Sequence, residues 1–129
     1  MARKNMVIGA LWIFLFMILG SVLEFKLGAG EEWLQSPMRQ LWKTAHLHGA
    51  IFGILNIIYA LLITRMKLNG KTISAGSILA LAGALVFPTS LFLAGIFYNF
   101  VYAAPFGGVS MILAWLLMSL ALTGRKAQV

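Results

Sequence analysis

Four long apolar segments, separated by short polar ones, dominate the pattern along the chain. The apolar segments cover residues 6–23, 41–64, 73–98 and 107–122. A helix needs about 20 residues to cross the hydrocarbon core of a bilayer, and these segments have roughly that length. None of them shows the charged stripe of a soluble amphipathic helix. The pattern therefore predicts four transmembrane helices and leaves no room for a separate soluble domain.

The connections between these segments predict how the helices are arranged. The loop 65–71 is short and basic, and the link 99–106 carries no charge. Short connections favour antiparallel neighbours in a helical bundle. We therefore expect an all-α integral membrane protein, in which residues 1–129 form a single up-down-up-down four-helix bundle.

The distribution of charge predicts the orientation of the bundle. The chain is 61% hydrophobic and 10% charged, with a net charge of +7. One end of the bundle holds seven basic and no acidic residues, namely Arg3, Lys4, Arg65, Lys67, Lys71, Arg125 and Lys126. The opposite end holds Lys26, Arg39 and Lys43 together with Glu24, Glu31 and Glu32. The positive-inside rule then predicts both termini in the cytoplasm, with the chain in the inner membrane and no nucleic-acid partner.

Two histidines near the start of the second predicted helix are the first candidates for a functional site. Polar side chains inside membrane helices are costly and often functional. At a rise of ~1.5 Å per residue, His46 lies roughly 8 Å below the end of its helix. Its neighbour His48 points about 200° away around the helix, so the two histidines face different partners. The chain has no cysteine, which excludes disulfides, thiolate metal sites and iron–sulfur clusters.

The face of the helix that carries His46 also carries Gly49 and Gly53 and has little side-chain bulk. Such a strip has two interpretations. It lets another helix approach closely, as in small-xxx-small packing. Alternatively, it admits a flat ligand beside the imidazole, and a haem with a proximal histidine fits that description.

The remaining polar groups have simpler interpretations. We expect Asn56 to form interhelical hydrogen bonds near mid-membrane, and His48 to face lipid headgroups or Glu24. A metal ion shared by His46 and His48 needs a further ligand, such as Glu24, a methionine or a residue of another subunit. Pro88 is expected to kink the third helix and free a carbonyl group.

The segment from Trp42 to Gly49 resembles styrene oxide isomerase. That family of small four-helix membrane enzymes carries a Trp-x-x-Ala-His segment at the start of its second helix, here Trp42 to His46. A glycine follows seven residues after that histidine, here Gly53. The order of helices and loops is also similar over most of the chain.

The resemblance implies a specific chemistry. It implies a homotrimer with ferric haem b between neighbouring subunits and His46 as the axial iron ligand, with Gly49, Phe52 and Gly53 beside the cofactor. The iron would act as a Lewis acid on an apolar epoxide from the membrane, and a hydride shift would give the carbonyl product. Asn56 and Ser90 are the candidate catalytic residues.

Two positions differ from the family pattern and keep other functions open. Phe52 stands where the family has an asparagine, and Ser90 is the best match for its catalytic tyrosine. These differences favour, as an alternative, a haem protein for electron transfer or sensing. The small size and sparse polar content favour a second alternative, a cofactor-free accessory subunit of a membrane complex.

Overall fold

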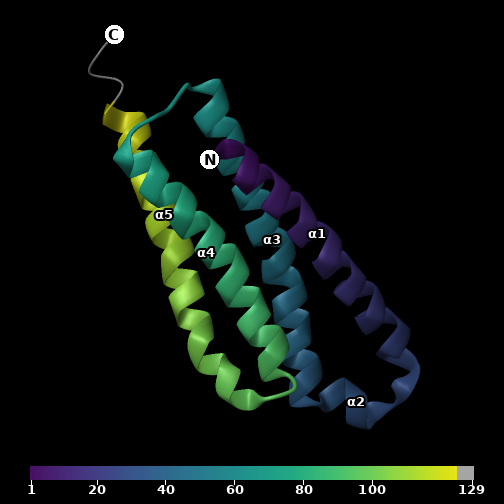
Figure 1. Cartoon of the computed structure of the whole chain (residues 1–129). Coiled ribbons are helices and arrows are strands. Elements are labelled where there is room, and N and C mark those ends of the chain that lie inside the picture. Colours follow the sequence, from purple (N-terminus) through teal and green to yellow (C-terminus); the bar gives the residue numbers. More distant parts are fainter. Residues whose placement is uncertain (125–129) are drawn as a thin grey trace.

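Four long helices lie side by side and alternate in direction (Figure 1). This computed structural model describes residues 1–124. The long helices are α1 (Ala2–Phe25), α3 (Pro37–Arg65), α4 (Lys71–Ala94) and α5 (Ala104–Gly124). Each of the four is long and apolar enough to span a membrane. The prediction of an all-α four-helix membrane bundle is confirmed, and the charges of Arg125 and Lys126 fall outside the described residues.

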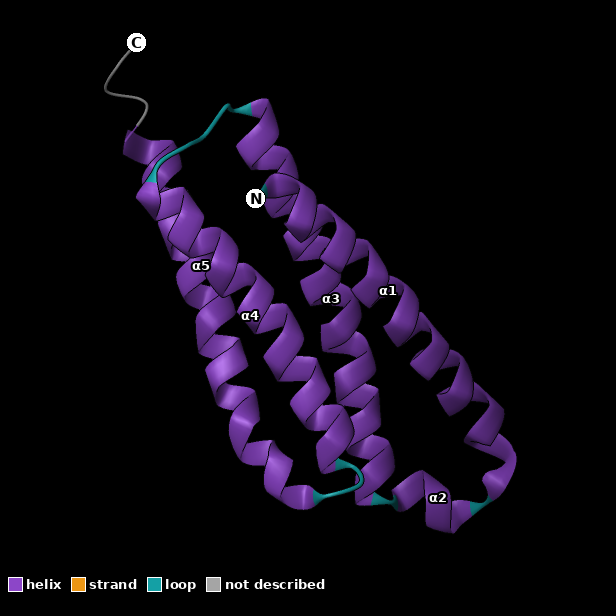
Figure 2. Cartoon of the chain, in the orientation of Figure 1, coloured by secondary structure: helices purple, strands orange, loops and turns teal. Residues whose placement is uncertain are grey.

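The connection between α1 and α3 is more regular than the polar loop expected from the sequence. It forms a 3-10 turn, Lys26–Ala29, and a short helix α2, Glu31–Gln35, which lies across one end of the bundle (Figure 2). α3 then begins at Pro37 and not near residue 41. The Ser36 Oγ caps it by accepting a hydrogen bond from the Arg39 N–H at 3.2 Å, and proline suits the first helical position.

The expected boundaries near residues 98 and 107 also shift. α4 ends at Ala94: Gly95 still has a helical backbone, and the chain becomes extended at Phe97. A 3-10 helix, Tyr98–Ala103, follows, and α5 begins at Ala104. Pro105 is tolerated there because the first turn of a helix needs no intrahelical N–H donor.

The helices pack as two antiparallel pairs, α1 with α3 and α4 with α5, which meet where α3 contacts α4. We call the end with Arg3, Lys4, Arg65, Lys67 and Lys71 the basic end. The opposite end, which we call the histidine end, has a core made by Phe16, Leu19, Leu23, Ala45, Leu91 and Ala104. This core holds the last turns of α1 against α3 and so positions His46.

Candidate functional site at the histidine end

His46 is half-buried on α3 and is oriented by the backbone of α1. Its Nδ1 lies 2.6 Å from the carbonyl oxygen of Phe16. The ring lies against Gly20, where an added Cβ would come within 2.5 Å of Cε1. Because a carbonyl oxygen only accepts, Nδ1 carries a proton, and in the neutral imidazole Nε2 then keeps its lone pair. A histidine that ligates a metal through Nε2 has this arrangement.

A small cavity adjoins His46 and contains charged groups of both signs. Its volume is about 170 Å³, and it is lined by Gly20, Leu23, Glu24, Leu27, Arg39, Lys43 and His46. Pockets for drug-sized ligands and cofactors measure ~300–1,000 Å³. One copy of the chain therefore offers an oriented imidazole and nearby cations, but not a complete haem pocket.

The glycine strip beside His46 is covered by α1. A Cβ added to Gly49 would lie 2.2 Å from Cγ of Phe16, and one added to Gly53 would lie 2.7 Å from the carbonyl oxygen of Gly9. The strip thus serves close helix packing, the first of the two interpretations. α1 leaves no space for a flat ligand against Gly49 and Gly53.

His48 faces the other side of α3, as its separation from His46 predicts. Its ring centroid lies 4.8 Å from that of Phe87 and 5.9 Å from that of Phe52, and its Nδ1 lies 3.0 Å from the Thr44 carbonyl oxygen. His48 therefore packs against aromatic side chains toward α4, whereas Glu24 lines the cavity at His46. Residues 1–124 contain no group of three or more His, Asp or Glu side chains that could hold a metal ion.

Asn56 forms interhelical hydrogen bonds, as the sequence predicts. Its Oδ1 accepts from the Asn5 Nδ2 at 2.9 Å, and its Nδ2 donates to the Ala80 and Phe52 carbonyl oxygens, both at 3.0 Å. The side chain is fully buried. Ten residues separate it from His46, which is about 15 Å along the helix axis. Asn56 is therefore not among the groups that surround His46.

Ser90 belongs to α4, and Phe52 lies on the side of α3 that faces α4. The Ser90 hydroxyl is buried and donates to the Phe87 carbonyl oxygen at 2.8 Å. Phe52 packs against Phe87, with ring centroids 5.4 Å apart. Phe52 lies on the side of α3 where His48 lies, and no contact within one chain joins Ser90 or Phe52 to His46 among the described residues. Their assignment to catalysis and haem binding stays a prediction.

An apolar cavity between α1 and α4 was not anticipated from the sequence. Its volume is about 260 Å³, and it is lined by Trp12, Leu15, Phe16, Leu19, Thr89 and Phe92. Among the described residues, the Trp12 Nε1 is buried without a hydrogen-bond partner. No sequence signal marks this cavity, because it depends on how far α1 stands from α4.

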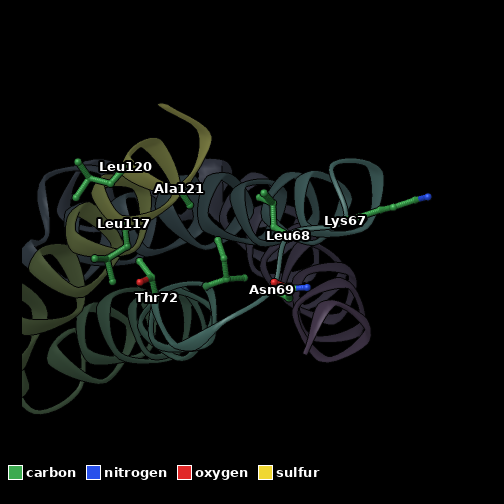
Figure 3. Close-up of a pocket in the computed structure, with 8 residues that line it drawn as sticks. Lys67, Leu68, Asn69, Thr72, Leu117, Leu120 and Ala121 are labelled. Carbon is green, nitrogen blue, oxygen red and sulfur yellow. The ribbon is translucent and has the colours of Figure 1, made fainter. Parts of the chain in front are cut away.

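A larger cavity of about 590 Å³ lies at the basic end, between the α3–α4 loop and α5 (Figure 3). It has no histidine or acidic lining residue, so it is separate from the site at His46.

The chain was compared with protein-family models, curated proteins and solved structures, and it matches none of them. The resemblance to styrene oxide isomerase consequently rests on Trp42, Ala45, His46 and Gly53 and on the order of the helices.

Proposed function

We propose that the chain is a haem b-binding membrane protein with His46 as the axial ligand, and that it isomerises an apolar epoxide to a carbonyl compound. The observation that carries this proposal is the contact between His46 Nδ1 and the Phe16 carbonyl oxygen. It fixes the ring orientation and leaves Nε2 as the basic nitrogen that iron requires.

The two basic residues beside His46 suit the carboxylate groups of haem b. Arg39 and Lys43 line the same cavity as His46, and charge-assisted hydrogen bonds to carboxylates are among the stronger polar contacts in proteins. The cavity is too small for the porphyrin ring, so a second copy of the chain must supply the rest of the pocket. We therefore propose a homo-oligomer, a trimer by the resemblance, with its basic end on the cytoplasmic side of the inner membrane.

Ferric haem supplies a Lewis acid at such a site. In the isomerisation, one C–O bond of the epoxide breaks, a hydride moves to the neighbouring carbon, and a C=O bond forms. No atom or electron is gained or lost, so no second substrate is needed. The chain contributes a route for an apolar substrate, because its apolar helices face lipid and the cavity at Phe16 and Trp12 is almost free of polar groups.

Optical spectroscopy on the purified protein tests this proposal. We expect a Soret band that His46→Ala abolishes and His48→Ala retains, since both changes remove an imidazole from the same helix but only His46 faces Phe16. Thermal unfolding of both variants checks that they fold. A protein that is colourless and does not take up added haem contradicts the proposal, as does loss of the band in His48→Ala alone.

The same preparation separates the proposed activity from electron transfer or sensing. A five-coordinate ferric spectrum together with turnover of an aryl epoxide supports the isomerase. A six-coordinate spectrum without turnover supports an electron-transfer or sensing protein. The covered strip at Gly49 and Gly53 favours a third candidate, a cofactor-free subunit, and that candidate predicts co-purifying membrane partners and no bound metal.

A further inference from the structure

α1 is offset along its axis relative to its neighbours. The Asn5 Nδ2 donates to the Asn56 Oδ1 at 2.9 Å and to the Ser77 carbonyl oxygen at 3.2 Å, so these three residues lie at one level. From Asn56, α3 continues for nine residues to Arg65. α4 begins at Lys71, six residues before Ser77. At ~1.5 Å per residue, the turn before Asn5 lies about 6 to 10 Å nearer the bilayer centre than those two helix ends. Figure 1 shows the N-terminus below the end of α3.

The offset places two cations, Arg3 and Lys4, below the ends of the neighbouring helices. Both side chains are exposed. The three acidic residues of the chain, Glu24, Glu31 and Glu32, all belong to the histidine end. No Asp or Glu is therefore available to neutralise these cations, and charged groups close to the hydrocarbon region are costly without a counter-charge.

A groove continues from these cations toward the bilayer centre. Arg3 and Lys4 line a cavity of about 420 Å³ together with Val7 and Ile8 of α1 and Leu81 and Leu85 of α4. The two cations mark one end of the groove, and four aliphatic side chains form the rest. A phospholipid matches this arrangement, because its charged phosphate group is followed by an apolar acyl chain.

We propose that this groove binds an anionic phospholipid, with its phosphate between Arg3 and Lys4 and an acyl chain against Val7, Ile8, Leu81 and Leu85. Basic residues at a membrane surface attract anionic lipids. A zwitterionic lipid brings a cation along with its phosphate and so neutralises the pair less well. The site lies at the opposite end of the bundle from His46 and does not depend on haem binding.

Two other lysines at the basic end provide a matched control. Lys67 lies in the loop after α3 and Lys71 begins α4, both beyond the level of Arg3 and Lys4. In Figure 3 the Lys67 side chain extends from the loop away from Leu117 and Leu120 of α5. Both lysine side chains are exposed. Removing this pair deletes the same charge from the same end without touching the groove.

Native mass spectrometry of the full chain, with added dioleoylphosphatidylglycerol or dioleoylphosphatidylcholine, measures the preference. We expect one phosphatidylglycerol to bind at least about tenfold more tightly than phosphatidylcholine, because two basic residues near the surface contribute together. The double variant Arg3→Gln/Lys4→Gln should lose that preference, and Lys67→Gln/Lys71→Gln should keep it within about twofold. Equal losses in both pairs would show a general attraction to the basic end and overturn the proposal.

A second variant tests the acyl-chain part of the groove. Leu85→Trp fills the space between α1 and α4 and leaves every charge in place. We expect it to weaken retention of phosphatidylglycerol as strongly as loss of the two cations does. Retention at the wild-type level would show that the lipid binds elsewhere, and equal binding of both lipids to the wild-type chain would overturn the proposal as a whole.

Discussion

The hydrogen bonds of Asn56 join three helices within the membrane, and their loss has a calculable cost. Replacing Asn56 with alanine removes the bond from the Asn5 Nδ2 at 2.9 Å and the bond to the Ala80 carbonyl oxygen at 3.0 Å. Asn5 keeps its contacts with the Ser77 hydroxyl and carbonyl. The substitution therefore breaks two interhelical bonds and leaves Asn5 with hydrogen-bond partners.

The expected loss of stability follows from that count. Interhelical hydrogen bonds in membrane proteins contribute ~0.6 kcal/mol on average and ~1.7 kcal/mol at most. Two such bonds give a loss of about 1 to 3 kcal/mol in the free energy of unfolding for Asn56→Ala. In a double-mutant cycle with Asn5→Ala, the coupling free energy should equal the contribution of about one hydrogen bond, because the two side chains share only one.

Reversible unfolding in mixed micelles, followed by far-ultraviolet circular dichroism, measures this loss. Asn69→Ala serves as the control, since Asn69 is an exposed asparagine in the α3–α4 loop. Equal stability of the two variants would refute the structural role of Asn56. A variant that keeps wild-type stability but loses the proposed epoxide turnover would instead place Asn56 in the reaction.

Two further predictions concern the packing of α3. Gly53→Ala should lower the free energy of unfolding by about 1 to 3 kcal/mol, because its Cβ would meet the Gly9 backbone oxygen; Gly28→Ala, where the space is open, should have little effect in the same assay. Trp42→Phe should cost about 0.5 to 1.5 kcal/mol, because it removes the Nε1 hydrogen bond to the Phe92 carbonyl oxygen and keeps the stacking on Phe92. A Trp42→Phe variant as stable as wild type would contradict the second estimate.

The fold follows from the sequence because the membrane allows few solutions. An apolar segment of roughly 20 residues must satisfy its own backbone hydrogen bonds, so it becomes a spanning helix. The boundaries were less predictable, since they depend on particular contacts. The early start of α3 has a recognisable signal in Ser36 and Pro37, whereas α4 ends at Ala94 inside the apolar segment 73–98, where the pattern continues without interruption.

The candidate site was predictable only in part for a similar reason. Helical geometry alone separates His46 from His48, and it leaves two interpretations of Gly49 and Gly53. The choice between them depends on which part of α1 lies opposite, namely the Phe16 ring at Gly49 and the Gly9 backbone at Gly53. The cavity between α1 and α4 depends on a distance between helices that no sequence pattern encodes.

The contacts of α1 fix its vertical register at three separate levels. The Phe16 carbonyl meets His46, Gly9 meets Gly53, and Asn5 meets Asn56. A slip of one helical turn is about 5.4 Å, and it would break all three contacts at once and force side chains into the glycine gaps. These contacts therefore hold α1 in one register relative to α3. The depth of its first turn in the bilayer is set by contacts that extend along much of the length of α3.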